Sequence, residues 1–154
     1  YTNFTYWTQH CWGVTCVNDM EAMLSYQPIT IGDKEQALAD LVRCYEKMMM
    51  RSHTNGGYVN LLDECWKMCE KFHTNIVIMY DHVSCKNVGG LHGLFEDQAR
   101  ERGIHLIWIP HDVMEPRTVS RREMREAFSQ YMVTVLNEKP LDPTLLDYED
   151  ALSW

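Results

Sequence analysis

Two short apolar runs have the composition of buried β-strands. Residues 76–80 read IVIMY and residues 104–109 read IHLIWI. A run of aliphatic and β-branched residues without polar alternation is typical of a strand that is buried on both faces of a parallel sheet. The sequence therefore predicts two strands of one parallel sheet.

The segments around these strands show the three-and-four spacing of apolar residues that is typical of amphipathic helices. Helices are predicted at 33–50, 58–72, 91–102 and 122–136. Gly103 is expected to end the third helix. Ser120 and Glu123 match the capping box that begins a helix, here the fourth.

The first 34 residues give weaker signals, because aromatic residues, threonines and cysteines dominate them. Only residues 19–26 are predicted to be helical there, with Asn18 or Asp19 as the cap. Weak strand signals lie around Thr5 and at 29–31. Those two segments, or sequence outside this chain, would supply the further strands that a stable sheet needs.

The order helix, strand, helix, strand, helix with short connections favours the α/β class. We expect an open parallel sheet with flanking helices, doubly wound in the manner of Rossmann-like or flavodoxin-like layers. Because two strands are few for such a sheet and residue 1 is Tyr rather than Met, we expect the chain to be part of a larger subunit.

Composition excludes several partner classes. The net charge of -8 repels a phosphate backbone, which argues against nucleic acid as a partner. No apolar run reaches 18 residues and no leader pattern is visible, so neither a membrane partner nor secretion is expected. Six cysteines in a chain of 154 residues then fit reduced thiols in the cytoplasm better than a disulfide scaffold.

Cys85 is the candidate for chemistry, because it follows the first predicted strand by a few residues. Ligands of open α/β sheets bind beyond the carboxyl ends of the strands. Lys86 and the approaching helix both favour a thiolate, and Gly89 and Gly90 allow a tight turn or a close approach. Such a thiolate is suited to act as a nucleophile or as a metal ligand, while a cysteine that merely packs is the structural alternative.

The neighbouring motifs narrow this choice only a little. The segment GGLHG at 89–93 lacks the spacing of a dinucleotide loop and the ending of a P-loop. Cys65 and Cys69 lie one helical turn apart, a spacing that suits a shared metal but is more often found in a helical core. Packing is also favoured for Cys11 and Cys16, although they lie beside a histidine in a segment without a predicted element.

Four motifs follow one another in a specific order. They are SCK at 84–86, ERGI at 101–104, HDVMEPR at 111–117 and SRREMREAF at 120–128. With the strands and helices between them, they make the segment 76–136 resemble the C-terminal end of a subunit of the 2-hydroxyacyl-CoA dehydratase and benzoyl-CoA reductase family. Each motif is weak alone, and their order and spacing carry the resemblance.

The resemblance implies a metal role for Cys85. Subunits of this family hold a four-iron four-sulfur cluster through three cysteines, and Cys85 matches the one that comes from the C-terminal domain. The other two cysteine ligands of the family come from an N-terminal domain and have no counterpart here, since Cys11 and Cys16 would align with the second domain. The implied reaction is a ketyl-radical elimination of water from a 2-hydroxyacyl-CoA, such as 2-hydroxyglutaryl-CoA, although this piece alone should be inactive.

The same resemblance implies the cofactors and partners. These are the iron-sulfur cluster, with a flavin allowed in the whole enzyme, a second homologous subunit in a heterodimer, an ATP-dependent iron-sulfur activator protein, and the acyl-CoA substrate. Residues 1–139 would be the C-terminal α/β domain, whose N-terminal part can be missing from this chain. Residues 140–154 would be an extended tail.

The residues around the predicted ligand are candidates for contacts with the cluster, the substrate or a partner subunit. They are His82, Ser84, Lys86, Asn87, Asp112 and Arg117. The first four would donate hydrogen bonds to the sulfides. For His82 a solvated loop position is the alternative, and for Arg117 it is an ion pair with a neighbouring carboxylate. The general base is not identifiable.

Two other functions remain open. One is a benzoyl-CoA reductase type of subunit, which passes low-potential electrons to an aromatic acyl-CoA. The other is a non-enzymatic α/β scaffold in which all six cysteines are buried thiols. Neither alternative is separated from the dehydratase by the sequence.

Overall fold

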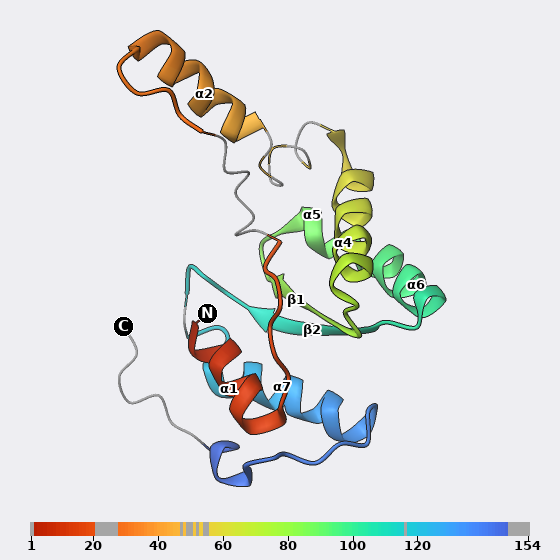
Figure 1. Ribbon diagram of the computed structural model, residues 1–154. Helices are drawn as coiled ribbons and strands as arrows, with labels where there is room; N and C mark the ends of the chain where they lie inside the picture. The colour runs from red at the N-terminus through yellow and green to blue at the C-terminus, as the bar shows by residue number, and fades with distance from the viewer. Residues whose placement is uncertain are drawn as a thin grey trace. The chain divides into compact units, whose positions relative to one another are not determined.

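The computed structural model describes residues 2–20, 28–46, 48, 51, 53, 56–115 and 117–147. The chain divides into two compact units, one formed by Tyr1–Cys16 with Asn75–Trp154 and the other by Val17–Thr74. The elements of each unit are shown in Figure 1. Among the helices described, none combines the length and apolarity needed to cross a lipid bilayer.

The unit formed by Val17–Thr74 includes the helices α2 (Lys34–Glu46) and α4 (Tyr58–Phe72). The predicted helix at 58–72 is confirmed. The helix predicted at 33–50 is confirmed over Lys34–Glu46, whereas the described residue Met48 is not helical. A left-handed residue, His73 with φ 52°, ends α4, and its N–H reaches the carbonyl of Glu70.

Two predictions for the first part of this unit have different outcomes. The strand predicted at 29–31 is wrong, because these described residues have no strand conformation. Instead the Thr30 N–H donates to Asp40 Oδ2 at 2.9 Å, which ties this segment to α2. The helix predicted at 19–26 lies largely outside the described residues.

The polarity of α2 is inverted relative to an ordinary surface helix. Its buried side chain is Asp40, which accepts hydrogen bonds from Thr30, Gln36 and Arg43. Its apolar side chains are exposed, with 48% for Leu38 and 64% for Tyr45. The amphipathic spacing therefore predicted the helix correctly but not the side that is buried.

The other unit contains the sheet. In chain order its elements are α1 (Thr2–Trp12), β1 (Ile76–His82), α5 (Lys86–Gly89), α6 (His92–Arg102), β2 (His105–His111), α7 (Arg121–Thr134) and the 3-10 turn η1 (Pro143–Leu145). Strands β1 and β2 pair in parallel, from Ile76 beside His105 to His82 beside His111. The two predicted strands and their parallel pairing are confirmed, and both strands extend two residues beyond the predicted carboxyl ends.

Helices lie on both faces of the sheet. Tyr80 of β1 contacts Phe4 of α1 with ring centroids 6.1 Å apart, on the face that also packs against α7. On the other face, Trp108 of β2 contacts Phe95 of α6 at 6.2 Å. The chain is thus a mixed α/β structure with a two-stranded, open, parallel sheet flanked by helices (Figure 1).

Helix α1 replaces the strand predicted around Thr5, so that prediction is wrong. The threonines suggested a strand, but Phe4, Trp7 and Cys11 recur at helical spacing and are all buried. Thr8 is also buried, and its hydroxyl donates to the Thr5 carbonyl at 2.9 Å. Burial of one helical face outweighed the local preference of the threonines.

The core between α1, α7 and the sheet is built around Phe128. Its ring is buried and lies edge-on to those of Phe4, Trp7 and Trp12, at centroid distances of 5.9, 5.7 and 6.4 Å. Such edge-on contacts are favourable beyond the area that they bury. Phe128 therefore joins α7 to α1 across the core.

The segment after α7 holds α1 in place. The Leu141 N–H donates to the carbonyl of Cys11 at 2.7 Å, and the Trp7 indole N–H donates to the carbonyl of Leu145 at 2.9 Å. The first bond satisfies a carbonyl at the end of α1 that the helix itself leaves unpaired, and the second ties the Trp7 side chain to η1. The described part of the C-terminal tail is thus part of the same unit.

The helix ends that the sequence marked are confirmed. Ser120 accepts the N–H of Glu123 at 3.1 Å, while the Glu123 carboxylate accepts the Ser120 N–H, which completes the capping box of α7. Gly103 ends α6 with φ 66°, a left-handed conformation that glycine adopts without strain. These local signals fix the ends of the elements on either side of β2.

We predict that Phe128→Ala lowers the free energy of unfolding by about 3–5 kcal/mol, because it leaves a cavity among three aromatic rings. The measurement is urea denaturation followed by tryptophan fluorescence and circular dichroism. Val133→Ala is the matched control, since this α7 side chain is exposed and should change stability by less than about 0.5 kcal/mol. Equal effects of the two substitutions would contradict the assignment of Phe128 to the core.

Candidate functional site

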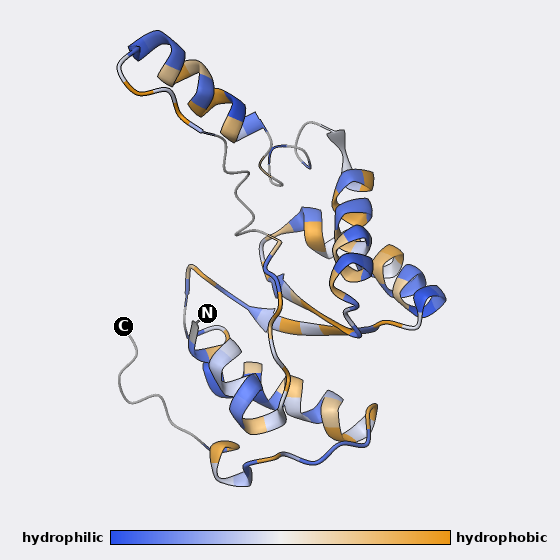
Figure 2. Cartoon of the chain, in the orientation of Figure 1, coloured by the Kyte–Doolittle hydropathy of each residue, from blue (hydrophilic) through white to orange (hydrophobic). Residues whose placement is uncertain are grey.

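Polar residues replace apolar ones where the two strands end. Figure 2 shows both strands orange along their middle and blue at their carboxyl ends. His82 ends β1 and His111 ends β2, and the two residues are register partners. In open parallel sheets this edge is where loops and ligands meet.

Cys85 lies three residues beyond the end of β1, as the residue that precedes α5. Its N–H donates to the His82 carbonyl at 2.9 Å, and its carbonyl accepts the Gly89 N–H at 3.0 Å. The side chain is half-buried. The thiol is therefore held by a turn with defined backbone bonds and remains reachable from solvent.

Gly90 has a steric role in this turn. A β-carbon added there would lie 3.0 Å from the carbonyl oxygen of Lys86, closer than side chains normally approach. Its φ of -71° is ordinary, so the close approach rather than an unusual backbone angle favours glycine. Gly89 has no neighbour within 4 Å of such an added atom, so only one of the two glycines is required by the packing.

His82 is held by the turn that leads to Cys85. The backbone N–H of Ser84 donates to Nδ1 of His82 at 3.2 Å, and the Ser84 hydroxyl lies 3.2 Å from the same nitrogen. Because Nδ1 accepts, the neutral ring carries its proton on Nε2. A metal-binding histidine needs the opposite arrangement, in which its second nitrogen donates, so this geometry suits His82 as a hydrogen-bond donor rather than as a ligand.

His111 packs beside this ring. The two imidazoles lie 5.8 Å apart in an edge-on arrangement, and His111 also contacts the ring of Tyr80 at 5.4 Å. Burial lowers the pKa of His111 below its ordinary value, and the neighbouring His82 lowers it further. Asp112 opposes this shift, but the folded chain still favours the neutral ring.

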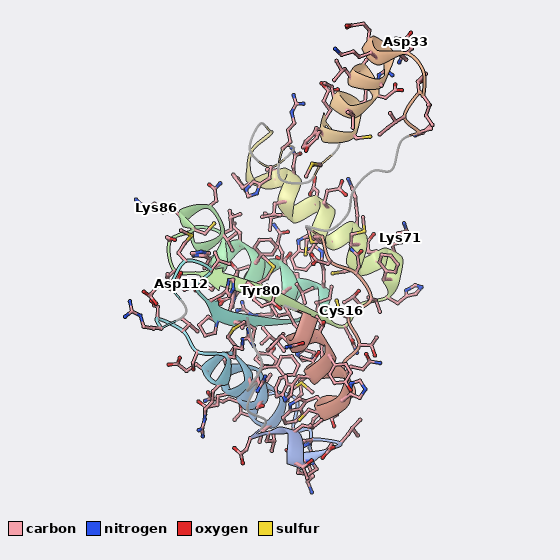
Figure 3. All side chains as sticks on the ribbon, turned by 90° about the vertical axis from the view of Figure 1, so that its left-hand side faces the viewer. Cys16, Asp33, Lys71, Tyr80, Lys86 and Asp112 are labelled. Carbon is pink, nitrogen blue, oxygen red and sulfur yellow. The ribbon has the colours of Figure 1, made fainter. Side chains whose placement is uncertain are left out.

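Asp112 shapes the loop that follows β2. Its Oδ1 accepts the N–H of Met114 at 2.9 Å and of Glu115 at 3.2 Å. The bond from Met114 is the largest cause of a lowered pKa for this carboxyl group. Figure 3 shows Lys86 and Asp112 at the same end of the sheet, beyond the position of Tyr80.

Arg117 is turned toward its own loop. Its Nε and Nη2 donate to the two carboxylate oxygens of Glu115, at 2.8 and 2.6 Å. This pairing is the main cause of the lowered pKa of Glu115. The geometry is the ion pair with a neighbouring carboxylate that was the alternative for Arg117.

The structure therefore brings only some of the predicted residues together. Through backbone and side-chain bonds, His82, Ser84 and Cys85 form one turn, with His111 beside it. Lys86 and Asn87 are exposed in the first turn of α5, and the structure gives them no contact with the thiol. Asp112 and Arg117 organise the neighbouring loop.

A contact on the other face of the sheet was not predicted. Nε2 of His92, the first residue of α6, lies 3.2 Å from Oδ1 of Asp81 in β1. The His92 ring also stacks on the indole of Trp108, with centroids 3.6 Å apart and planes 17° from parallel. The only sequence signal was an acidic residue and a histidine on either side of the cysteine turn.

The cysteines differ in how well they fit a metal role. Cys11, Cys65 and Cys69 are buried, as their predicted packing role requires, and burial raises the pKa of Cys11. Cys16 is exposed, in a segment away from the edge that holds Lys86 (Figure 3), so the packing predicted for it is wrong, and the six cysteines are not all buried thiols. Within the described residues no three His, Cys, Asp or Glu side chains gather as a metal site.

Comparisons with models of protein families, with curated proteins and with solved structures found no match to this chain.

We predict that His111 makes the stability depend on pH. Its pKa is lower in the folded chain than the ordinary 6.5, so the folded state binds the proton less tightly than the unfolded state. The contribution of His111 to the free energy of unfolding should be fully present above pH 6.5 and should be lost progressively as the pH falls below it. In His111→Gln this part of the loss should disappear, as measured by urea denaturation between about pH 7.5 and about pH 5.5.

The exposed residue His10 offers the control. In His10→Gln the pH dependence should remain that of the parent chain, because the substitution leaves His111, His82 and Asp112 in place. A parent-like pH dependence in His111→Gln would show that His111 is not held neutral by its surroundings.

Proposed function

We propose that this chain is the C-terminal part of a 2-hydroxyacyl-CoA dehydratase subunit, in which Cys85 supplies one of three cysteine ligands to a four-iron four-sulfur cluster. The observation that carries the proposal is the position of Cys85, a half-buried thiol held at the carboxyl edge of two parallel strands. The order of the motifs between 76 and 136 adds the resemblance to the family.

When bound, such a cluster supplies one-electron chemistry and an open coordination position. The chain's own residues would place and surround one thiolate. The Ser84 N–H holds His82 as the tautomer with its proton on Nε2, so this ring has a donor to offer to an acceptor at the edge. Lys86, the next residue, is exposed at the start of α5 and places a positive charge at this edge of the sheet.

We also propose that β1 and β2 belong to a larger, doubly wound parallel sheet. Within the described residues each strand pairs only with the other, so each has an edge at which a further strand can bond. Helices on both faces are the arrangement that such sheets require. The remaining strands and the other two cysteines would come from elsewhere in a larger cytoplasmic subunit.

The proposal includes the partners that the reaction needs. They are a homologous second subunit, an ATP-dependent iron-sulfur activator and an acyl-CoA substrate. A benzoyl-CoA reductase subunit would use the same thiol geometry, and the balance of electrons separates the two reactions. A dehydratase recovers the activating electron in each turnover, whereas a reductase consumes electrons in proportion to its product.

We predict that Cys85→Ala removes the cluster from the anaerobically purified pair of full-length subunits. One thiolate of three is lost, so iron and acid-labile sulfide should fall by about four atoms each per cluster. The measurement is chemical analysis of iron and sulfide, together with the visible absorbance of the cluster. Cys85→Ser, which keeps a weaker ligand, should retain part of the iron.

Cys16→Ala provides the matched control, because this cysteine is also accessible but lies in a different segment. It should leave the iron and sulfide content unchanged. If Cys85→Ala retained its full iron content, or if the parent pair bound none, the cysteine would be a structural thiol and the scaffold function would be favoured.

A further inference from the structure

We propose that Asp81, His92 and Trp108 form a clamp that fixes the position of the Cys85 thiol. The clamp bears on catalysis only through the ligand role proposed above for Cys85, but the clamp itself can be tested on the thiol alone. None of its three side chains needs to touch a cluster or a substrate. They act as positioning residues.

The clamp closes the base of the turn that carries Cys85. Asp81 lies at the end of β1, and His92 opens α6, with the ten residues 82–91 between them. The 3.2 Å contact between the two side chains therefore joins the place where the chain leaves the strand to the place where it enters the helix. Cys85 is inside the loop that this contact closes.

Trp108 connects the same contact to the second strand. In the parallel register Trp108 is the partner of Met79, and Asp81 follows Met79 by two residues, so all three side chains lie on one face of the sheet. The stack of His92 on Trp108, at 3.6 Å and 17°, is thus made above β2 while its pair with Asp81 is made to β1. One imidazole links both strands and the start of α6.

The chemistry of the contact explains why it depends on all three groups. Nε2 of His92 is buried and not aligned for a hydrogen bond, although it lies within ion-pair distance of the Asp81 carboxylate. A buried ring nitrogen without a hydrogen bond is costly, and the nearby negative charge offsets this cost. Because no aligned hydrogen bond fixes the His92 ring, its stacking on Trp108 holds it in position.

The rest of the turn is bonded mostly within itself. Cys85 bonds to His82 and to Gly89, and the Leu91 N–H donates to the Val88 carbonyl at 2.9 Å. At its start the turn is tied to β2 by the Val83 N–H, which donates to the His111 carbonyl at 3.1 Å. At its other end, the clamp and the buried side chain of Leu91 hold it. Loss of the clamp would leave the end of the turn to Leu91 and to the packing of Phe95 in the next turn of α6.

The test measures how fast iodoacetamide alkylates Cys85 in the intact chain, by mass spectrometry of the peptides. Cys16 in the same molecule serves as the reference, because it is exposed and belongs to another segment. In His92→Ala the ratio of the Cys85 rate to the Cys16 rate should rise roughly fivefold or more, since the turn opens locally more often. Circular dichroism confirms that the variant is folded.

Three further variants make the result specific. His92→Phe keeps a ring on Trp108 but loses the contact with Asp81, and Asp81→Asn keeps the shape but loses the charge, so each should give a smaller increase than His92→Ala. Arg100→Ala, which removes the exposed pair of α6 with Asp97, should change nothing. If His92→Ala does not fold, His92→Phe and Asp81→Asn still test whether the clamp limits the alkylation of Cys85.

A ratio within about twofold of the parent value in all folded clamp variants would overturn the inference and show that Leu91 and the backbone bonds suffice.

In the assembled subunit pair, His92→Ala should retain iron but alter the electron paramagnetic resonance of the reduced cluster. A changed alkylation ratio in a protein that binds no iron would support the clamp and reject the proposed function. Loss of iron in Cys85→Ala with unchanged alkylation ratios in the clamp variants would support the proposed function and reject the clamp.

Discussion

The parallel register of β1 and β2 determines the arrangement of every group at the candidate site. It sets Ile76 beside His105 at one end and His82 beside His111 at the other. Side chains alternate between the faces of a strand, so a shift of one residue would exchange the two faces. If β2 slipped by one residue, His111 would no longer share a face with Tyr80 and His82, and Trp108 would no longer share one with Asp81. The register is in turn fixed by the apolar residues that precede these polar ends.

The two faces of the sheet have different tasks. The face toward α1 and α7 is filled by the aromatic core around Phe128, and the tail after α7 completes it through Cys11 and Trp7. The face toward α6 is smaller and contains the stack of His92 on Trp108. The first face holds the buried cluster that contains Phe128, whereas the second holds the contact of His92 with Asp81.

Much of this unit could be predicted from the sequence because its signals are local. The apolar runs indicated both strands, and Ser120, Glu123 and Gly103 marked the helix ends. Helix α1 could not be predicted, because its threonines favour a strand and only the tertiary burial of Phe4 and Trp7 selects the helix. In α2 the same kind of pattern gave the helix but not its buried side chain, because the hydrogen bonds of Asp40 to Thr30, Gln36 and Arg43 have no signal in the apolar spacing.

At the candidate site, position in the sequence predicted which residues lie near the ends of the strands but not which groups each side chain bonds. His82, Asp112 and Arg117 do lie near the expected edge, yet each is engaged by groups two or three residues away, which the separation in sequence did not reveal. The contact of Asp81 with His92 spans eleven positions and depends on the turn geometry, so no periodicity predicts it. For a lone thiol at a sheet edge, these bonds matter more than the identity of its neighbours. They decide where the sulfur lies at the edge of the sheet.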